Sequence, residues 1–310
     1  MNTRVLIVGG AGYIGGAVTD FLQEGNCEVR VYDGLFYDDA YRKKVDFVYA
    51  DIRQQECLQT HLDWADTVIW LAALVADGSC ALYPELAVAL NTKSVEWLIQ
   101  HFDGRIIFPS TCLVYAIQNT MLDESAGTDP LTIYAKTKLA AEKILEDRAL
   151  IVRLSTVFGI SDMFSRPRLD LVVNLLTARA AREGKMTVFG GAQYRPFIHV
   201  RDVGKVMANN IRTTTTGIFN LHTENMRIVD LAQRISSHIP QAQLEVQSAT
   251  IEQTGDYRMI SDKARQVLGF NPRYTIDDGI SEMKELALRL KDIRNPRYSN
   301  EAFLKINPLR

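Results

Sequence analysis

The residues best suited to acid–base chemistry lie in the stretch YAKTK, which places Tyr134 and Lys138 four positions apart. On a helix this spacing brings both side chains to one face. A free tyrosine has a pKa near ~10, so a phenolate that acts as a base near neutrality needs a pKa lowered by about 3, which nearby positive charge favours. The sequence has no other tyrosine followed by lysine at this spacing. A tyrosine and a lysine on the surface of an amphipathic helix would show the same spacing. The neighbouring motifs must therefore distinguish a catalytic pair from a surface pair.

Two hydroxyl side chains stand one predicted strand before this pair. The stretch PSTCLVY brings Ser110 and Thr111 to the carboxyl end of an apolar run. In open α/β sheets this is the edge at which ligands bind. We therefore group Thr111 with Tyr134 and Lys138 as the candidate catalytic set.

A glycine-rich stretch, VGGAGYIGG, follows the first apolar run and places Gly9, Gly12 and Gly15 three residues apart. Gly9 lets the chain turn sharply off a strand, Gly12 lets the backbone approach a pyrophosphate, and Gly15 lets a helix pack closely on the sheet. The phosphates would then face the free N–H groups and the positive dipole end of that helix. A glycine-rich turn alone is weak support, because many strand–helix turns use glycine.

An acidic residue supports the same interpretation. Asp33 ends the second predicted strand, 18 residues after Gly15, where an acid should hydrogen-bond the adenosine ribose of a dinucleotide. It is followed by Gly34 and not by Arg or Lys, which favours NAD over NADP because the carboxylate would repel a 2′-phosphate. The alternative is a structural turn with a capping or loop aspartate.

The elements that must position these residues alternate between apolar strands and amphipathic helices, which predicts right-handed βαβ units. We expect an α/β fold, a Rossmann-type doubly wound parallel sheet with a smaller C-terminal substrate-binding lobe. Residues 1–160 would form the NAD-binding domain and 161–310 mainly the substrate lobe, with segments near 197–221 returning to the first domain. Expected strands are 4–8, 27–33, 46–51, 66–73, 105–110, 149–156 and 217–222; expected helices are 13–24, 84–102, 133–147, 169–182, 228–237 and 282–291. The polar tail from 292 receives no role.

Composition narrows the class of protein. The 310 residues are 47% hydrophobic and 23% charged with a formal net charge of −2, which gives no reason to expect nucleic acid as a partner. No apolar run reaches the ~18 residues of a membrane span, and the first apolar stretch runs into the glycines and not into a cleavage site. The four cysteines lack metal-ligand spacing, so we expect reduced thiols, no metal and a cytoplasmic protein.

Taken together, these motifs resemble a known family. The glycine spacing, Asp33, ADIR (50–53), LAA (71–73), STCLVY and YAKTK are similar to those of extended short-chain dehydrogenase/reductases, and within them to the NAD-dependent epimerase/dehydratase group that acts on nucleotide sugars. The resemblance continues through RLSTVFG and RPFIHVRDV to DYRMISDKARQVLGF, which covers nearly the whole chain.

The resemblance implies roles for individual residues. Tyr134 as a phenolate would take a proton from a sugar hydroxyl, usually at C4, while hydride passes to the nicotinamide. Thr111 would hydrogen-bond the reacting oxygen, and Lys138 would also hold the nicotinamide ribose. The implied cofactor-binding residues are Gly9, Gly12, Tyr13, Ile14, Gly15, Asp33, Asp51, Ile52, Leu71, Ala72, Ala73, Tyr134 and Lys138. Leu71 to Ala73 fit sheet core equally well.

In the substrate lobe, the resemblance implies that Arg195 and Arg258 contact the diphosphate of the sugar nucleotide, where a planar guanidinium suits phosphate oxygens. Asn174 and Thr111 complete the predicted substrate-binding set. Surface ion pairs remain the alternative for both arginines. From position alone, Arg166 and Arg168 are expected to border the sugar pocket. His199 alternates within an apolar strand and is expected to be structural.

The chain departs from the family pattern at positions that bear on the reaction. Many relatives place Asp-Glu directly after the active-site Thr, and that pair removes water across C5–C6; here the positions hold Cys112 and Leu113, which disfavours a 4,6-dehydratase. Cys112 is either a small buried side chain or a thiol with an acid–base role. Thr156 stands where the family has an Asn, which puts the usual diphosphate contact in doubt.

The sequence thus predicts an NAD-dependent enzyme that oxidises a nucleotide sugar at C4, most simply a 4-epimerase. The alternative is a 4-dehydrogenase or 4-ketoreductase that releases its product, and a non-catalytic NAD-binding protein is a third reading. The resemblance also implies a homodimer that packs through the helices expected at 84–102 and 133–147.

Overall fold

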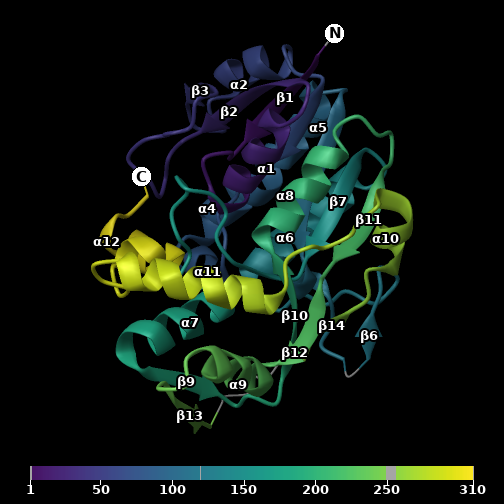
Figure 1. Cartoon of the computed structure of the whole chain (residues 1–310). Helices are drawn as coiled ribbons and strands as arrows, with labels where there is room; N and C mark the ends of the chain where they lie inside the picture. The colour runs from purple at the N-terminus through teal and green to yellow at the C-terminus, as the bar shows by residue number, and fades with distance from the viewer. Residues whose placement is uncertain (1, 119, 249–255, 310) are drawn as a thin grey trace.

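The computed structural model describes residues 2–118, 120–248 and 256–309. A seven-stranded sheet forms its centre in the order β11-β7-β5-β4-β1-β2-β3, and all of its neighbouring strands are parallel (Figure 1). Its strands are β1 Thr3–Val8, β2 Cys27–Asp33, β3 Asp46–Tyr49, β4 Thr67–Trp70, β5 Arg105–Thr111, β7 Ala149–Leu154 and β11 Gly217–Leu221. The predicted Rossmann-type α/β fold is confirmed.

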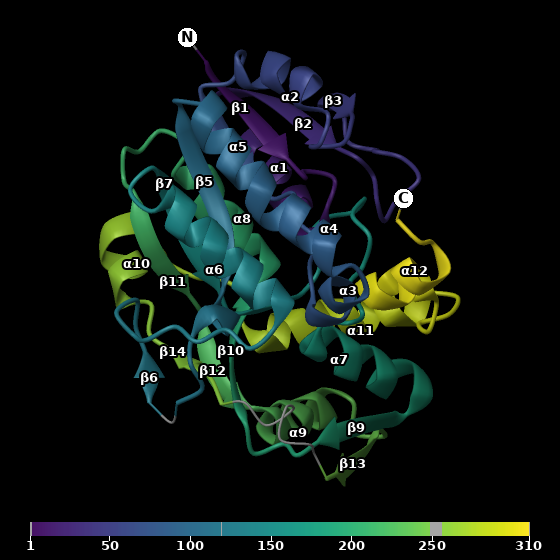
Figure 2. The ribbon, with the colours of Figure 1, turned by 180° about the vertical axis from the view of Figure 1, so that it is seen from behind.

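Helices cover both faces of this sheet, because strands buried on two sides need two apolar layers. On one face lie α1 (Tyr13–Gln23), α8 (Val200–Asn209) and α10 (Asp262–Leu268). On the other lie α2 (Gln55–Leu62), α5 (Ser94–His101) and α6 (Ile133–Leu145), which Figure 2 shows from their own side. Residues 197–221 return to this domain as the end of a lobe strand, then α8, then β11.

The helix expected at 84–102 is interrupted in the structure. It consists of α4 (Pro84–Val88), a π-helical turn η1 (Ala89–Lys93) and α5, and a short helix α3 (Asp77–Leu82) precedes it. The π turn presents Asn91 to the backbone of Leu74, whose N–H donates to Oδ1 (2.7 Å) and whose carbonyl accepts from Nδ2 (2.9 Å). That exchange fixes the loop after β4, which lines the cavity described below. Periodicity alone does not reveal a single wide turn.

The smaller lobe holds three short sheets and its own core. β8 (Thr156–Phe158), β10 (Tyr194–His199) and β12 (Glu224–Arg227) form one, β9 (Lys185–Phe189) and β13 (Gln243–Gln247) a second, and β6 (Met121–Leu122) and β14 (Arg258–Met259) a third. Helices α7 (Val172–Glu183), α9 (Ile228–His238) and α11 (Ile276–Arg289) pack with them. The strand expected at 149–156 is therefore two strands in different sheets, and α11 begins at Ile276 because Thr275 and Asp278 form a capping box.

The tail from 292, to which the sequence assigns no role, folds back onto the first domain. It forms η4 (Pro296–Tyr298) and α12 (Asn300–Ile306); α12 packs against α3, and Leu304 is fully buried in the hydrophobic core of the first domain. In Figures 1 and 2 the C-terminus lies beside the loop that follows β2. The tail thus ties the small lobe to the first domain.

Within the described ranges, none of the helices is long and apolar enough to cross a membrane. The same ranges contain no cluster of three His, Cys, Asp or Glu side chains that could hold a metal ion. All four cysteines are free thiols.

Candidate active site

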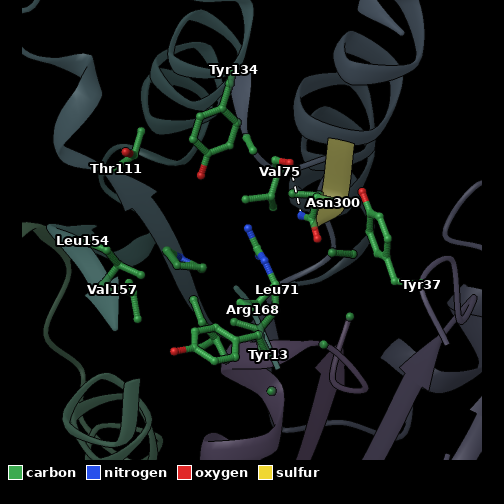
Figure 3. Close-up of a pocket in the computed structure, with 18 of the residues that line it drawn as sticks. Tyr13, Tyr37, Leu71, Val75, Thr111, Tyr134, Leu154, Val157, Arg168 and Asn300 are labelled. Atoms are coloured by element: carbon green, nitrogen blue, oxygen red, sulfur yellow. Dashed lines mark hydrogen bonds between the residues drawn. The ribbon is translucent and has the colours of Figure 1, made fainter. Parts of the chain in front are cut away.

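A cavity of about 520 Å³ opens at the carboxyl ends of the parallel strands, between the sheet and the small lobe (Figure 3). Its size falls within the range of small-molecule and cofactor sites. Most of the residues predicted from sequence line it, namely Gly9, Gly12, Tyr13, Ile14, Gly15, Asp33, Asp51, Ile52, Leu71, Ala72, Ala73, Thr111, Tyr134, Lys138 and Arg195.

The glycine loop has the geometry that a phosphate cradle needs. Gly9 has φ +83°, and a Cβ there would lie 2.3 Å from the backbone N of Ala72. A Cβ at Gly15 would lie 2.3 Å from the carbonyl oxygen of Gly10. Gly12 is the N-cap of α1 and supplies no side-chain cap, so first-turn N–H groups of α1 remain available to a ligand. The loop therefore fits the pyrophosphate of a dinucleotide.

Asp33 marks one end of the cavity. Its carboxylate accepts hydrogen bonds from the backbone N–H of Ala11 (3.0 Å) and of Leu35 (2.7 Å), one on each oxygen. Burial raises the pKa of Asp33, and these two donors act in the opposite direction. Each oxygen keeps a lone pair for a further donor, so the carboxylate can accept from vicinal ribose hydroxyls.

Thr111, Tyr134 and Lys138 lie at the other end. Tyr134 and Lys138 are on α6, whose first turn is capped by Thr132 accepting from the N–H of Ala135 (3.2 Å). In Figure 3 the Tyr134 hydroxyl points into the cavity. Thr111 Oγ1 accepts from the N–H of Leu113 (3.2 Å), which leaves its own proton to donate.

Burial shifts Tyr134 and Lys138 toward their neutral forms. Burial raises the pKa of the Tyr134 phenol, while the positive charge of Arg168 lowers it. Lys138 is 4% exposed, and burial lowers its pKa to about 7 against the opposing effect of Glu142. Its Nζ lies 4.0 Å from the centre of the Phe108 ring. A bound positive charge would be needed to bring the phenol within reach of neutral pH.

Neutral polar side chains also line this end of the cavity. Burial raises the pKa of Cys112 to about 12, which keeps it a thiol at neutral pH and removes it as a base. The hydroxyls of Ser110 and Ser155 are buried and make no hydrogen bond within the described part of the chain, yet both residues line the cavity. Each hydroxyl is therefore available to a ligand atom or a water molecule in the cavity. Sequence analysis did not single out Ser155.

The predicted substrate-binding residues lie in different surroundings, and one of the three described next lines the cavity. Arg195 lines the cavity with its guanidinium 5.5 Å from the centre of the Tyr257 ring. Arg258 packs its guanidinium over the Tyr194 ring (5.0 Å) and is not among the described lining residues. Asn174 is fully buried outside the cavity, where its Oδ1 accepts from the N–H of Gly159 (2.9 Å). The geometry of Asn174 is that of a loop anchor and not of a substrate ligand.

His199 is buried as expected of a structural residue. Its Nε2 lies 2.7 Å from Glu282 Oε1, and its Nδ1 accepts from the N–H of Arg201 (3.2 Å), so that it caps α8. Its ring stacks on Tyr274. These contacts occupy both ring nitrogens away from the cavity.

Several lining residues were missed because nothing in the local sequence marks them. Asn300 comes from the tail, and Asp170 and Tyr37 come from loops. Leu35 (φ +52°) and Ala76 (φ +85°) are the non-glycine residues of the described chain with positive φ, and both line the cavity. Backbone strain of this kind concentrates at ligand sites. Arg166 and Arg168 also line it, and the Arg166 guanidinium lies 4.9 Å from the centre of the Tyr37 ring.

Comparisons with known proteins agree with this geometry. A model of the NAD dependent epimerase/dehydratase family matches residues 5–221. A UDP-glucose 4-epimerase of Lactobacillus helveticus is 28% identical over 322 aligned residues, with 90% of this chain and 95% of that one covered. UDP-glucuronic acid decarboxylase 3 of Arabidopsis thaliana is 25% identical, with 95% and 92% covered.

Among solved structures, the UDP-glucose-4-epimerase of Stenotrophomonas maltophila with bound NAD and formylated UDP-arabinopyranose superimposes with a TM-score of 0.84. It is 22% identical, and 93% of this chain and 98% of that chain are covered, so this likeness shows the fold. The family match spans the glycine loop, Asp33, Thr111, Tyr134 and Lys138 alike. The chain therefore belongs to the NAD dependent epimerase/dehydratase family, and it is an enzyme whose cofactor is NAD.

Proposed function

We propose that this enzyme oxidises a nucleotide sugar at C4 to a 4-keto species and then reduces it from the other face, as a nucleotide-sugar 4-epimerase. The observation that carries the proposal is the shared cavity: Thr111, Tyr134 and Lys138 line the same space as the glycine loop and Asp33. Curated relatives that include UDP-glucose 4-epimerases make UDP-sugars the first candidates.

The chain's own residues supply the proton chemistry of this reaction. NAD, held by the glycine loop and Asp33, would supply the hydride acceptor for the oxidation and the hydride donor for the reduction. Tyr134 takes the proton of the C4 hydroxyl in the oxidation and gives it back in the reduction, and Thr111 donates a hydrogen bond to the same oxygen. Lys138 lowers the free energy of the phenolate when it is charged. Arg195 lies in the small-lobe wall, where it can bind the diphosphate of the sugar nucleotide.

Dehydration is the less suitable reaction for this cavity. Removing water across C5–C6 needs an acid and a base near the sugar carbons, and the positions after Thr111 hold Cys112 and Leu113. With its pKa raised to about 12, the Cys112 thiol cannot serve as that base near neutrality. Oxidation at C4 without epimerisation uses the same three residues and remains the alternative.

Incubation with UDP-, dTDP-, GDP- and CDP-sugars tests the proposal, with absorbance at ~340 nm and product NMR followed together. An epimerase converts one sugar stereoisomer into another without net formation of NADH. Steady NADH formation supports a dehydrogenase instead, and a product that has lost water contradicts the exclusion of dehydration.

Tyr134→Phe should leave NAD affinity within about twofold and lower turnover by at least ~100-fold, because general acid–base groups contribute that much or more. Tyr115→Phe is a matched control, since the Tyr115 hydroxyl donates to Asn220 Oδ1 (2.7 Å) and lies outside the cavity lining. Unchanged turnover in Tyr134→Phe would remove this phenol from the mechanism.

The assembly and the compartment complete the proposal. We infer a homodimer that packs through the α4–α5 helix and α6, by resemblance to the family, and a cytoplasmic location because the four thiols are free. Light scattering coupled to gel filtration measures the first directly, and a monomeric mass contradicts it.

A further inference from the structure

Arg168 occupies an unusual position in the cavity. It lies in the loop between β8 and α7, is 8% exposed, and extends its guanidinium into the middle of the cavity, with Tyr134 on one side and Tyr13 on the other (Figure 3). Asp170 binds the guanidinium through Nε (2.6 Å) and Nη2 (3.1 Å). This fork leaves Nη1 and one proton of Nη2 to face a ligand.

The loop around Arg168 is held on both sides. Asn174 Nδ2 donates to the carbonyl of Arg168 (3.0 Å), and the N–H of Leu169 donates to the carbonyl of Tyr298 in the tail (2.9 Å). Asp170 itself accepts from the backbone N–H of Asn300 (2.9 Å). The guanidinium is thus fixed in advance, which reduces the entropy lost on binding a ligand.

This wall of the cavity carries surplus positive charge. Arg166 lines the cavity beside Arg168, and its side chain donates to neutral oxygens, the carbonyl of Arg297 (2.5 Å) and the amide of Asn300. Asp170 and Asp38 are the carboxylates that act on Arg166, and Asp38 also pairs with Arg297 (2.7 Å), so two carboxylates face the three guanidinium groups of Arg166, Arg168 and Arg297. A buried ion pair often stabilises a protein no more than apolar residues of similar size would, so stability alone does not account for the Arg168–Asp170 pair. An anion bound at this wall would offset the surplus.

The ends of the cavity identify the anion. A dinucleotide bound with its adenosine ribose at Asp33 and its nicotinamide at Tyr134 and Lys138 would have its pyrophosphate between these two ends of the cavity. Arg168 stands at this middle position, next to Tyr13, which follows the uncapped N-terminus of α1. We propose that Arg168 is a ligand of the NAD pyrophosphate, presented by the small lobe from the side opposite the glycine loop and oriented by Asp170.

This assignment differs from the expectation that Arg168 borders the sugar pocket. Arg195 lies on another part of the wall, over the Tyr257 ring (5.5 Å), and is the residue suited to the diphosphate of the substrate. The proposal depends on NAD as cofactor and not on which sugar reaction follows. Its failure would therefore leave the epimerase proposal intact.

The test is a set of binding titrations on the full chain freed of nucleotide, with NAD, ADP-ribose, adenosine and UDP as probes. ADP-ribose carries the pyrophosphate and adenosine does not. Arg168→Gln should weaken NAD and ADP-ribose by about 10- to 100-fold, as expected for a hydrogen-bonded charge, and change adenosine and UDP less than about twofold. Arg195→Gln is the crossed control and should weaken UDP while sparing NAD.

Three outcomes overturn the proposal. NAD affinity within threefold of the parent shows that Arg168 does not bind the pyrophosphate. A loss for UDP in place of NAD assigns Arg168 to the substrate, and an equal loss for adenosine shows a structural role. If Arg168→Gln does not fold, Arg168→Lys replaces it in the test. A lysine keeps the charge but cannot bind Asp170 and a phosphate at once, so this variant should bind ADP-ribose more weakly than the parent. An affinity for ADP-ribose equal to the parent's overturns the proposal.

Discussion

Replacing Lys138 by methionine should abolish turnover and yet make the nucleotide-free protein more stable. Methionine keeps the length and apolar stem of this buried side chain and removes the amine. The stability gain follows from burial, which lowers the pKa of Lys138 from 10.5 to about 7. A pKa difference of this size corresponds to about 5 kcal/mol between the charged lysine in the native protein and in the unfolded chain.

The sign and the pH window follow from proton binding. Between pH 7 and 10.5 the unfolded chain holds a proton that native Lys138 has lost, so the parent's stability rises with pH in this window. Below pH 7 both states hold the proton and the full penalty applies. The free energy of unfolding of Lys138→Met should exceed that of the parent by about 5 kcal/mol at pH 6, about 4 kcal/mol at pH 7.5 and about 2 kcal/mol at pH 9. Titrating groups that do not interact with Lys138 are common to both proteins and cancel in the difference.

Urea unfolding followed by tryptophan fluorescence at these three pH values measures the advantage. Lys136→Met is the matched control, because Lys136 is exposed on the same helix, and its stability should stay within about 0.5 kcal/mol of the parent at every pH. A Lys138→Met advantage that does not change with pH, or a parent that is more stable at pH 6, would refute the reasoning.

Three further substitutions test separate parts of the structure. Glu142→Gln leaves the buried Arg153 without the carboxylate that binds its Nε (3.0 Å) and Nη2 (2.6 Å). The free energy of unfolding should fall by about 3–5 kcal/mol, and a fall of less than about 1 kcal/mol contradicts this prediction. Gly9→Ala should abolish measurable NAD binding because its Cβ would meet backbone at 2.3 Å, whereas Gly184→Ala, with positive φ but open space, should cost only about 1 kcal/mol in a melting experiment. Asp33→Asn should raise NADP affinity relative to NAD by about tenfold in titrations, and a parent that already binds both equally contradicts the predicted preference.

Much of the site could be predicted from sequence because its motifs are local. Gly9, Gly12 and Gly15 sit within one strand–helix turn, and Tyr134 and Lys138 within one turn of a helix, so spacing alone brings each set together. Their meeting in one cavity follows from the parallel sheet, since the carboxyl ends of its strands share one edge.

The remaining residues could not be predicted, because long-range packing places them. Asn300 reaches the cavity only because Leu304 anchors the tail in the core of the first domain, more than 200 positions from the glycine loop. Arg168 sits in a loop of irregular backbone whose direction is set by Asn174 and by the tail. The π turn at Asn91 and the division of the strand at Leu154 were likewise invisible to periodicity.

The electrostatics of the cavity connect stability with function. In the nucleotide-free protein, burial favours a protonated phenol at Tyr134 and a partly neutral amine at Lys138, which is the wrong pair of states for proton abstraction. The positive charge of the nicotinamide in NAD would stabilise the Tyr134 phenolate, so the base should form fully only in the loaded enzyme. Burial makes the charged form of Lys138 costly for folding, and it also keeps Tyr134 and Lys138 neutral until NAD binds. Replacing Lys138 should therefore raise the stability of the protein and abolish its activity together.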